Sequence, residues 1–231
     1  MPPAIFARYD AIRIINLPHR TDRRREMDEE LEKCGLRGDP RVAYFPAVLA
    51  TDAGPFMNRG THGCFLSHLG VLEQAARDGR SVLVLEDDCT FLPAIFDYQP
   101  EPDCDVFCGG YLSADEGNLA HGNLIGAHFM GFSAEVVPVA ARFLRGILES
   151  TTPPDPQAAA EPGFNPAVKP PVDGAYVWLR RANPQLTTAF AQLGGQRSSR
   201  TDIGELKVFD RLPLVRDLAQ LARQALRSIK S

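Results

Sequence analysis

Long hydrophobic runs are absent from this sequence of 231 residues. A membrane-spanning helix needs about 18 to 20 consecutive apolar residues, and no segment provides them. The first 17 residues also lack the basic start and long apolar centre of a secretory signal peptide, and Arg13 interrupts their main hydrophobic stretch. The sequence therefore predicts neither a membrane span nor secretion.

An excess of basic residues is also missing. The chain has 25 Lys and Arg against 29 Asp and Glu, which gives a formal net charge of -4 and a pI near 5.8. A protein that coats nucleic acid needs a basic face, so no nucleic-acid partner is expected. The hydrophobic fraction of 44% and the charged fraction of 23% are typical of globular proteins, and the length suits one main domain.

Cysteine is scarce, and its positions form no regular framework. The five are Cys34, Cys64, Cys89, Cys104 and Cys108. An odd number without a regular spacing favours free thiols in a reducing compartment over disulfides. Cys104 and Cys108 have no second ligand pair that would complete a closed zinc site. We therefore expect a cytoplasmic protein.

Apolar segments that fit strands alternate with segments that fit helices. The predicted strands cover residues 11–17, 41–48, 82–85, 105–110, 126–133 and 186–192, and the predicted helices cover 21–34, 61–79, 134–150 and a segment that begins near 172. The run at 82–85 is wholly apolar, as in a central strand that is covered on both faces. This order predicts an α/β domain over residues 1–210 with a mostly parallel central sheet.

Two segments depart from this alternation. Residues 151–171 contain seven prolines and no periodicity, which predicts an irregular loop and makes it a candidate lid over a bound substrate. Residues 211–231 have the pattern of a basic amphipathic helix, with leucines on one stripe and arginines opposite. Such a helix binds an anionic membrane surface or packs on its own domain or a second copy, and the pattern leaves both interpretations open.

Three adjacent acidic residues follow the central strand directly, in the segment "LVLEDDCTF" at residues 83–91. The carboxyl end of a parallel strand is where ligands collect in open α/β sheets. Glu86, Asp87 and Asp88 repel one another when ionised unless a cation compensates, and their hard oxygen atoms suit Mg²⁺ or Mn²⁺. The alternative interpretation is that they cap a helix that starts near Thr90, or are simply solvated.

Residues 86–90 also come within one residue of the Asp-x-Asp-x-Thr pattern of haloacid-dehalogenase-like phosphohydrolases. In that pattern the first aspartate is the nucleophile, and here the position holds Glu86. No lysine after Asp88 stands beside an acidic pair in an apolar context, as that family requires. A metal-dependent phosphohydrolase is therefore the alternative activity.

Three ordered blocks of the sequence resemble glycosyltransferase family 25, which contains lipopolysaccharide-biosynthesis and procollagen galactosyltransferase-like enzymes. The segment "IINLPHRTDRRREM" resembles the family's opening Asn-Leu, Arg and Asp-Arg-Arg signature. The segments "GTHGCFLSHLGVLEQA" and "VLVLEDDCTF" resemble its Gly-Cys-x-x-Ser-His and Leu-Glu-Asp-Asp blocks. Weaker similarities follow in "GFSAE", "PVDGAYVWL" and "QRSSRTDIG".

The resemblance implies a single Rossmann-like nucleotide-sugar transferase domain of the GT-A type. It further implies an inverting enzyme that uses Mn²⁺ or Mg²⁺ and moves a hexose, galactose above others, from a UDP-sugar donor. The acceptor would be a glycan or a lipid-linked saccharide, as in lipopolysaccharide or oligosaccharide biosynthesis. A lipid-linked acceptor would give the basic terminal helix a use as a peripheral contact at the inner face of the cytoplasmic membrane. A catalytically inactive nucleotide- or glycan-binding protein is the non-enzymatic alternative.

The same resemblance assigns donor-binding residues. Asn16, Leu17 and Arg20 follow the first strand, where an arginine is a planar bidentate donor for phosphate or base edges. The Arg23–Arg25 run is predicted to be a solvated helix face.

Ser67 and His68 are predicted to lie near the donor. Adjacent residues on a helix do not pair with each other, so a serine hydrolase is excluded, and a packed histidine is the alternative for His68. Glu86 and Asp87 are predicted donor contacts. Asp88 is the predicted metal ligand, together with Glu86.

A general base is needed to take the proton of the acceptor hydroxyl. We assign this role to Asp173, which follows the proline-rich loop, with Asp202 in "SRTDIG" as the second candidate. The alternative for Asp173 is an N-cap of the helix that follows it.

Overall fold

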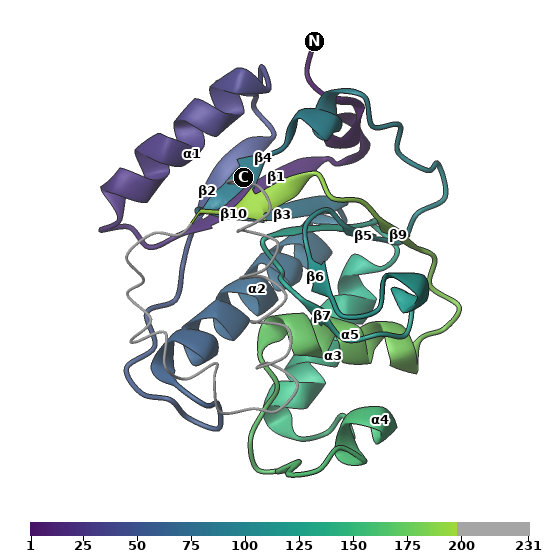
Figure 1. Cartoon of the computed structure of the whole chain (residues 1–231). Coiled ribbons are helices and arrows are strands. Elements are labelled where there is room, and N and C mark those ends of the chain that lie inside the picture. The colour runs from purple at the N-terminus through teal and green to yellow at the C-terminus, as the bar shows by residue number, and fades with distance from the viewer. Residues whose placement is uncertain (198–231) are drawn as a thin grey trace, which may run out of the picture.

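The computed structural model describes residues 1–197 (Figure 1). The predicted terminal helix at 211–231, the boundary at residue 210 and the candidate base Asp202 lie outside these residues. Among residues 1–197, no helix combines the length and apolar character that crossing a membrane requires.

A sheet with the strand order β2-β1-β3-β8-β5-β9 forms the centre of the molecule. Its strands are β1 (Ala11–Asn16), β2 (Val42–Pro46), β3 (Val82–Glu86), β5 (Val106–Cys108), β8 (Phe129–Phe132) and β9 (Thr188–Phe190). The β1–β2, β1–β3 and β5–β9 pairs are parallel, whereas β8 is antiparallel to both β3 and β5. Only β8 therefore runs against the other strands, and the predicted mostly parallel α/β sheet is confirmed.

Helices cover both faces of this sheet (Figure 1). One face carries α1 (Thr21–Lys33), and the other carries α2 (Arg59–Asp78), α3 (Val137–Glu149) and α5 (Val172–Ala182). Side chains alternate between the faces along each strand, as the pleat requires. Leu83 and Leu85 pack in the α1-side core with Met27, whereas Val82 and Val84 pack in the α2-side core. All four β3 residues from Val82 to Leu85 are fully buried, as predicted for a central strand.

The α2 helix follows the sequence signals at both of its ends. The Asn58 side chain accepts a hydrogen bond from the Thr61 backbone N–H at the start, and Gly79 adopts a left-handed φ of 64° at the end. Within the helix, a Cβ atom on Gly63 would lie 2.4 Å from the Val48 carbonyl oxygen. The absence of a side chain at Gly63 therefore lets the 47–58 loop pack directly on α2.

Short elements complete the described chain. They are the 3₁₀ helices η1 (Ala4–Arg8), η2 (Pro93–Phe96) and η3 (Glu116–Asn118), the strands β4 (Cys89–Phe91), β6 (Leu112–Ser113), β7 (Leu124–Ile125) and β10 (Gly194–Gln196), and the helix α4 (Pro156–Ala159). β4 pairs antiparallel with β10. The idea that the acidic residues cap a helix near Thr90 is therefore wrong, because a strand follows them.

The proline-rich segment 151–171 is irregular apart from the single turn α4. It borders a cavity of about 190 Å³ that is lined by Phe164, Lys169 and Trp178 among others. The absence of a long regular element agrees with the sequence prediction, and its role as a lid stays a prediction.

Candidate active site

The acidic segment lies at the carboxyl edge of the parallel strands, where β1 and β3 end side by side. Ile15 of β1 is paired in register with Glu86 of β3. The backbone continues this pairing for one residue, because the Asp87 N–H donates to the Ile15 carbonyl at 3.1 Å. Asn16 and the three acidic residues are therefore brought to one place by the strand order itself.

Asp87 is buried and points toward the α1 side. Its Oδ2 accepts a 2.7 Å hydrogen bond from Asn16 Nδ2, and its Oδ1 accepts a 2.8 Å charged hydrogen bond from Arg23 Nη1. Both carboxylate oxygens are thus engaged. Asp87 ties the end of β1 to the first turns of α1 and holds the Asn16 amide and the Arg23 guanidinium in fixed positions.

Asp88 has a different environment. Its Oδ2 lies 3.7 Å from Arg23 Nη1, while its Oδ1 is buried and has no hydrogen-bond partner among residues 1–197. Burial raises the pKa of Asp88 to about 6, and the negative charge of Glu86 adds to this rise, whereas Arg23 opposes it. A buried carboxylate oxygen of this kind fits a hard divalent cation.

Glu86 points to the opposite side, toward α2. Its Oε1 lies 3.2 Å from His68 Nε2 and 3.7 Å from Cys64 Sγ, and its Oε2 accepts from Gln196 Nε2 at 3.3 Å. Burial pushes the pKa of Glu86 up, but the hydrogen bond from His68 and further contributions from its neighbours, the Cys64 hydrogen bond among them, outweigh it, so the net shift is downward. Glu86 is therefore held as a carboxylate by several donors.

His68 is fully buried and links Glu86 to α5. Its Nδ1 lies 3.1 Å from the Tyr176 hydroxyl. A neutral imidazole satisfies both contacts when Nε2–H donates to Glu86 and Nδ1 accepts from Tyr176. His68 is therefore packed and hydrogen-bonded, as the alternative interpretation has it. Its Nε2 contact also positions the Glu86 carboxylate.

Cys64, His68 and Glu86 can together hold a metal ion, because their ligand atoms all lie within 4.8 Å of one another. Within residues 1–197, no other group of three or more histidine, cysteine or acidic residues brings its ligand atoms this close together. It shares Glu86 with the predicted ligands but adds a thiol and an imidazole in place of Asp88. Burial raises the pKa of the Cys64 thiol well above its ordinary value, and the charge of Glu86 adds to this.

Asp173 comes to the same region from the start of α5. Its Oδ2 accepts from the Gly126 N–H at 3.1 Å and its Oδ1 from the Gly174 N–H at 2.8 Å. Burial raises the pKa of Asp173, and the negative charge of Glu86 contributes to the rise. Pro171 is the N-cap of α5 and Asp173 lies within the helix, so the N-cap interpretation of Asp173 is wrong.

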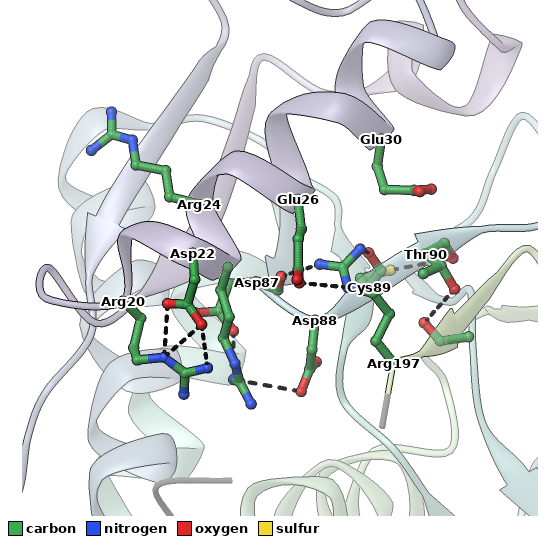
Figure 2. Close-up of polar contacts among 12 residues, drawn as sticks. Arg20, Asp22, Arg24, Glu26, Glu30, Asp87, Asp88, Cys89, Thr90 and Arg197 are labelled. Carbon is green, nitrogen blue, oxygen red and sulfur yellow. Dashed lines mark hydrogen bonds and ion pairs between the residues drawn. The ribbon is translucent and has the colours of Figure 1, made fainter. Parts of the chain in front are cut away.

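Basic side chains surround the acidic residues (Figure 2). Arg20 pairs with Asp22 at 2.8 Å, and Arg197 donates from Nη2 to the Asp87 carbonyl oxygen at 2.6 Å and lies 3.2 Å from Glu26. The prediction of a solvated face for the Arg23–Arg25 run is wrong for Arg23, whose side chain is only 14% exposed and reaches the acids.

Arg23 and Arg197 are the site residues that sequence reasoning missed. The helical spacing of α1 carried the signal for Arg23, since Met27 of the buried stripe lies four residues further along and therefore on the same face. Arg197 is about 110 residues from its partner Asp87, and no local sequence pattern predicts that contact.

Two predicted donor residues have internal hydrogen bonds. The Ser67 hydroxyl, which is buried, donates to the Gly63 carbonyl at 2.6 Å and accepts from the Val48 N–H at 2.8 Å. Leu17 is half-buried, and its carbonyl accepts from the Arg20 N–H at 2.8 Å in the turn that leads into α1. Ser67 thus holds the 47–58 loop on α2, and donor contacts of both residues stay predictions.

Comparison with known proteins supports the sequence resemblance. No protein family model matches the chain. Two curated mosquito proteins, each named "Glycosyltransferase 25 family member", match it over 104 residues: that of Anopheles gambiae is 38% identical and that of Aedes aegypti 36% identical. Each match covers 36% of this chain and about a sixth of the relative, 17% and 16% respectively. The resemblance to family 25 is confirmed for this part of the chain.

Two solved structures show a more distant likeness. A glycosyltransferase involved in glycosylation of the major capsid of PBCV-1 is 14% identical with a TM-score of 0.44, over 79% of this chain and 82% of that one. The CTP:phosphocholine cytidylyltransferase LicC of Streptococcus pneumoniae is 13% identical with a TM-score of 0.37, over 81% of this chain and 70% of that one.

Proposed function

We propose that this protein is an inverting, metal-dependent glycosyltransferase that moves a hexose, galactose above others, from a UDP-sugar to a glycan or lipid-linked saccharide. A role in lipopolysaccharide or oligosaccharide biosynthesis follows from that acceptor class. One observation carries the proposal: the buried Asp88 oxygen without a partner among residues 1–197, at the carboxyl edge of the sheet. The partial similarity to the two mosquito proteins supports it.

Asp88 and Glu86 are the proposed ligands of Mn²⁺ or Mg²⁺. The fit rests on the Asp88 Oδ1 atom and on its pKa near 6, because both indicate a carboxylate that lacks a sufficient counter-charge. When bound there, a divalent cation supplies positive charge against the negative charge that grows on the leaving diphosphate. Cys64 and His68 lie next to Glu86 and form with it a second candidate ligand set. Its thiol and imidazole are softer ligands than carboxylates, and they favour Zn²⁺ or Co²⁺ over Mg²⁺.

The donor is held by the edge that β1, α1 and the acidic segment form. Asn16 and Arg23 are fixed by Asp87, and Arg20 lies between them in sequence, at the start of α1. Amide and guanidinium groups hydrogen-bond uridine, ribose and phosphate oxygens, and arginine does so in a bidentate manner. Glu86, oriented by His68, is the proposed contact of the donor ribose.

Asp173 is the proposed general base. A base works best when its pKa approaches the operating pH, and burial moves the pKa of Asp173 in that direction. The acceptor oxygen bonds to the anomeric carbon while the bond from that carbon to the diphosphate oxygen breaks. The hydroxyl proton passes to the Asp173 carboxylate, UDP leaves with the bonding electrons, and a single displacement inverts the anomeric configuration.

Measurement of UDP release tests this proposal. The purified full chain is incubated with a panel of UDP-sugars, with Mn²⁺, Mg²⁺, Zn²⁺ or a chelator, and with and without saccharide acceptors. Metal-dependent release from one donor, raised by an acceptor, is the expected result. A covalent acyl-phosphate on Glu86 with a phosphomonoester would instead establish the phosphohydrolase alternative, and UDP-sugar binding without turnover would establish the binding protein.

We propose a location in the cytoplasm, with peripheral contact at the inner face of the cytoplasmic membrane through residues 211–231. All five cysteines of the chain are free thiols, which supports a reducing compartment. Flotation with anionic liposomes compares the full chain with a chain that ends at Asp210. Loss of flotation on truncation is expected, and equal flotation of the two chains would refute the membrane contact.

A further inference from the structure

The Arg23 guanidinium lies where it would compete with a divalent metal ion for the acidic residues after β3. Its Nη1 is 2.8 Å from Asp87 Oδ1 and 3.7 Å from Asp88 Oδ2, and its side chain is only 14% exposed. A guanidinium in this position already neutralises part of the acidic pair in the protein without metal or donor. The contact comes from α1, whereas both acids follow β3.

The two carboxylates differ in what they can give to a metal ion. Asp87 uses Oδ2 for Asn16 and Oδ1 for Arg23. Asp88 keeps a buried Oδ1 without a hydrogen-bond partner among residues 1–197 and has only the longer approach of Arg23 at Oδ2. A divalent ion in the proposed metal site would therefore bind at Asp88, and there it would meet the positive charge of Arg23 a few ångströms away. Two cations so close together in a partly buried site repel each other strongly.

We propose that Arg23 competes with the divalent cation for Asp88 when no donor is bound, and contacts the diphosphate of the sugar nucleotide when the cation and donor bind together. The inference rests on the proposed function, because it uses the same metal site. The diphosphate supplies the negative charge that Arg23 loses when the metal takes Asp88. Metal and donor thus bind cooperatively, and the metal alone binds weakly.

The neighbouring arginines do not have this arrangement. Arg24 stacks over the ring of Tyr44 in β2 at 4.2 Å. Arg25 is exposed and one residue further along the same helix. Arg25→Gln is therefore a matched control for Arg23→Gln: it removes the same charge from the same helix without touching Asp87 or Asp88.

The test measures Mn²⁺ binding by electron paramagnetic resonance, with and without UDP, on the full-length protein. Without UDP, Arg23→Gln is expected to bind Mn²⁺ about tenfold more tightly than the unchanged protein, in line with ordinary coupling between two binding events. With UDP, the same variant is expected to bind Mn²⁺ more weakly than the unchanged protein. Arg25→Gln is expected to match the unchanged protein in both conditions.

A second variant keeps the inference falsifiable if Arg23→Gln fails to fold, which circular dichroism reports. Arg23→Lys keeps the charge and is expected to restore weak Mn²⁺ binding without UDP, but not the full effect of UDP, because an ammonium lacks the planar fork. If Arg23→Gln leaves Mn²⁺ affinity unchanged or lowers it in the absence of UDP, the inference is wrong. The inference is also wrong if Arg25→Gln changes the Mn²⁺ affinity as much as Arg23→Gln does.

The outcomes separate this inference from the proposed function. Tighter Mn²⁺ binding by Arg23→Gln, together with no turnover of any UDP-sugar, would support the competition and refute the transferase. Metal-dependent UDP release with an unchanged Mn²⁺ affinity in Arg23→Gln would support the transferase and refute the competition.

Discussion

The two faces of the sheet hold two adjacent carboxylates in different ways. On the α1 side, Asp87 is held by the Arg23 guanidinium and the Asn16 amide at 2.8 and 2.7 Å. On the α2 side, Glu86 is held by His68 and Cys64, and Tyr176 supports the imidazole from behind. Consecutive side chains at a strand end point to opposite faces. Three acidic residues in a row are thereby divided between a positively charged pocket and a largely neutral one.

This division leaves Asp88 as the carboxylate that neither face satisfies. Its Oδ1 has no partner within the described chain, and its pKa is raised to about 6. We therefore propose Asp87 as a structural support with a donor contact, Glu86 as a donor contact and second metal ligand, and Asp88 as the first metal ligand. The predictions below test that distinction, beginning with the largest effect.

Replacement of Asp88, the proposed metal ligand, has the largest expected effect. Asp88→Asn is expected to lower the rate of UDP release at least about a hundredfold, because loss of one preorganised charge in a catalytic site commonly costs that much. The fold is expected to survive, since the change removes an unsatisfied acid. Steady-state UDP release with Mn²⁺ measures the effect. Asp97→Asn, at an exposed position, is the control, and an active Asp88→Asn enzyme would contradict the assignment.

On the α1 side, loss of Asp87 is expected to reduce stability. Asp87→Ala leaves the partly buried Arg23 without its close counter-charge, and breaking such a pair costs roughly 3 kcal/mol in the free energy of unfolding. Urea denaturation followed by circular dichroism measures the loss. Asp88→Asn analysed in parallel is expected to be close to the unchanged protein. Equal destabilisation of the two variants would remove the distinction between Asp87 and Asp88.

The pKa of Asp173 predicts the pH dependence. As the proposed base, Asp173 acts when deprotonated, so kcat/KM is expected to fall as the pH drops through a pKa above the ordinary aspartate value. A raised pKa in the folded state also means that the carboxylate form opposes folding: its contribution to stability is present at low pH and is lost as the pH rises through that pKa. Asp173→Asn is therefore expected to abolish turnover yet keep or raise stability at neutral pH. An unchanged acid limb in an active Asp173→Asn enzyme would exclude Asp173 as the base.

On the α2 side, removal of the Tyr176 hydroxyl is expected to have the smallest effect. Tyr176→Phe takes one hydrogen-bond partner from the buried His68, which costs about 1 kcal/mol in stability. The expected functional result is a raised KM for the donor, because Glu86 is less firmly oriented. Thermal unfolding and donor saturation curves measure both effects. A loss of stability as large as that of Asp87→Ala would show that the neutral side is as tightly coupled as the charged side.

The sequence predicted those features best that depend on one short segment of the chain. The apolar run at 82–85 predicted a central strand, and the acids after it predicted a ligand site at the sheet edge. The antiparallel direction of β8 was not predictable, because Phe129–Phe132 is equally apolar in either orientation.

Contacts between segments that are far apart in the sequence could not be predicted from it. The three arginines of α1 look alike in sequence, but a helix turns about 100° per residue, so Arg23 faces the acids while Arg24 faces Tyr44. The support of His68 by Tyr176 joins residues 108 positions apart, and only the packing of α5 on α2 creates it.

The most direct test of the central claim measures the metal and the diphosphate together. Mn²⁺ broadens the ³¹P NMR signals of a phosphate that lies beside it, so spectra of UDP are recorded with the unchanged protein, with Asp88→Asn and with Asp97→Asn. The account predicts strong, protein-dependent broadening with the unchanged protein and Asp97→Asn, and none beyond that of free Mn²⁺ with Asp88→Asn. Broadening that persists in Asp88→Asn but disappears in Cys64→Ser would place the metal at the Cys64, His68 and Glu86 group and contradict the assignment to Asp88.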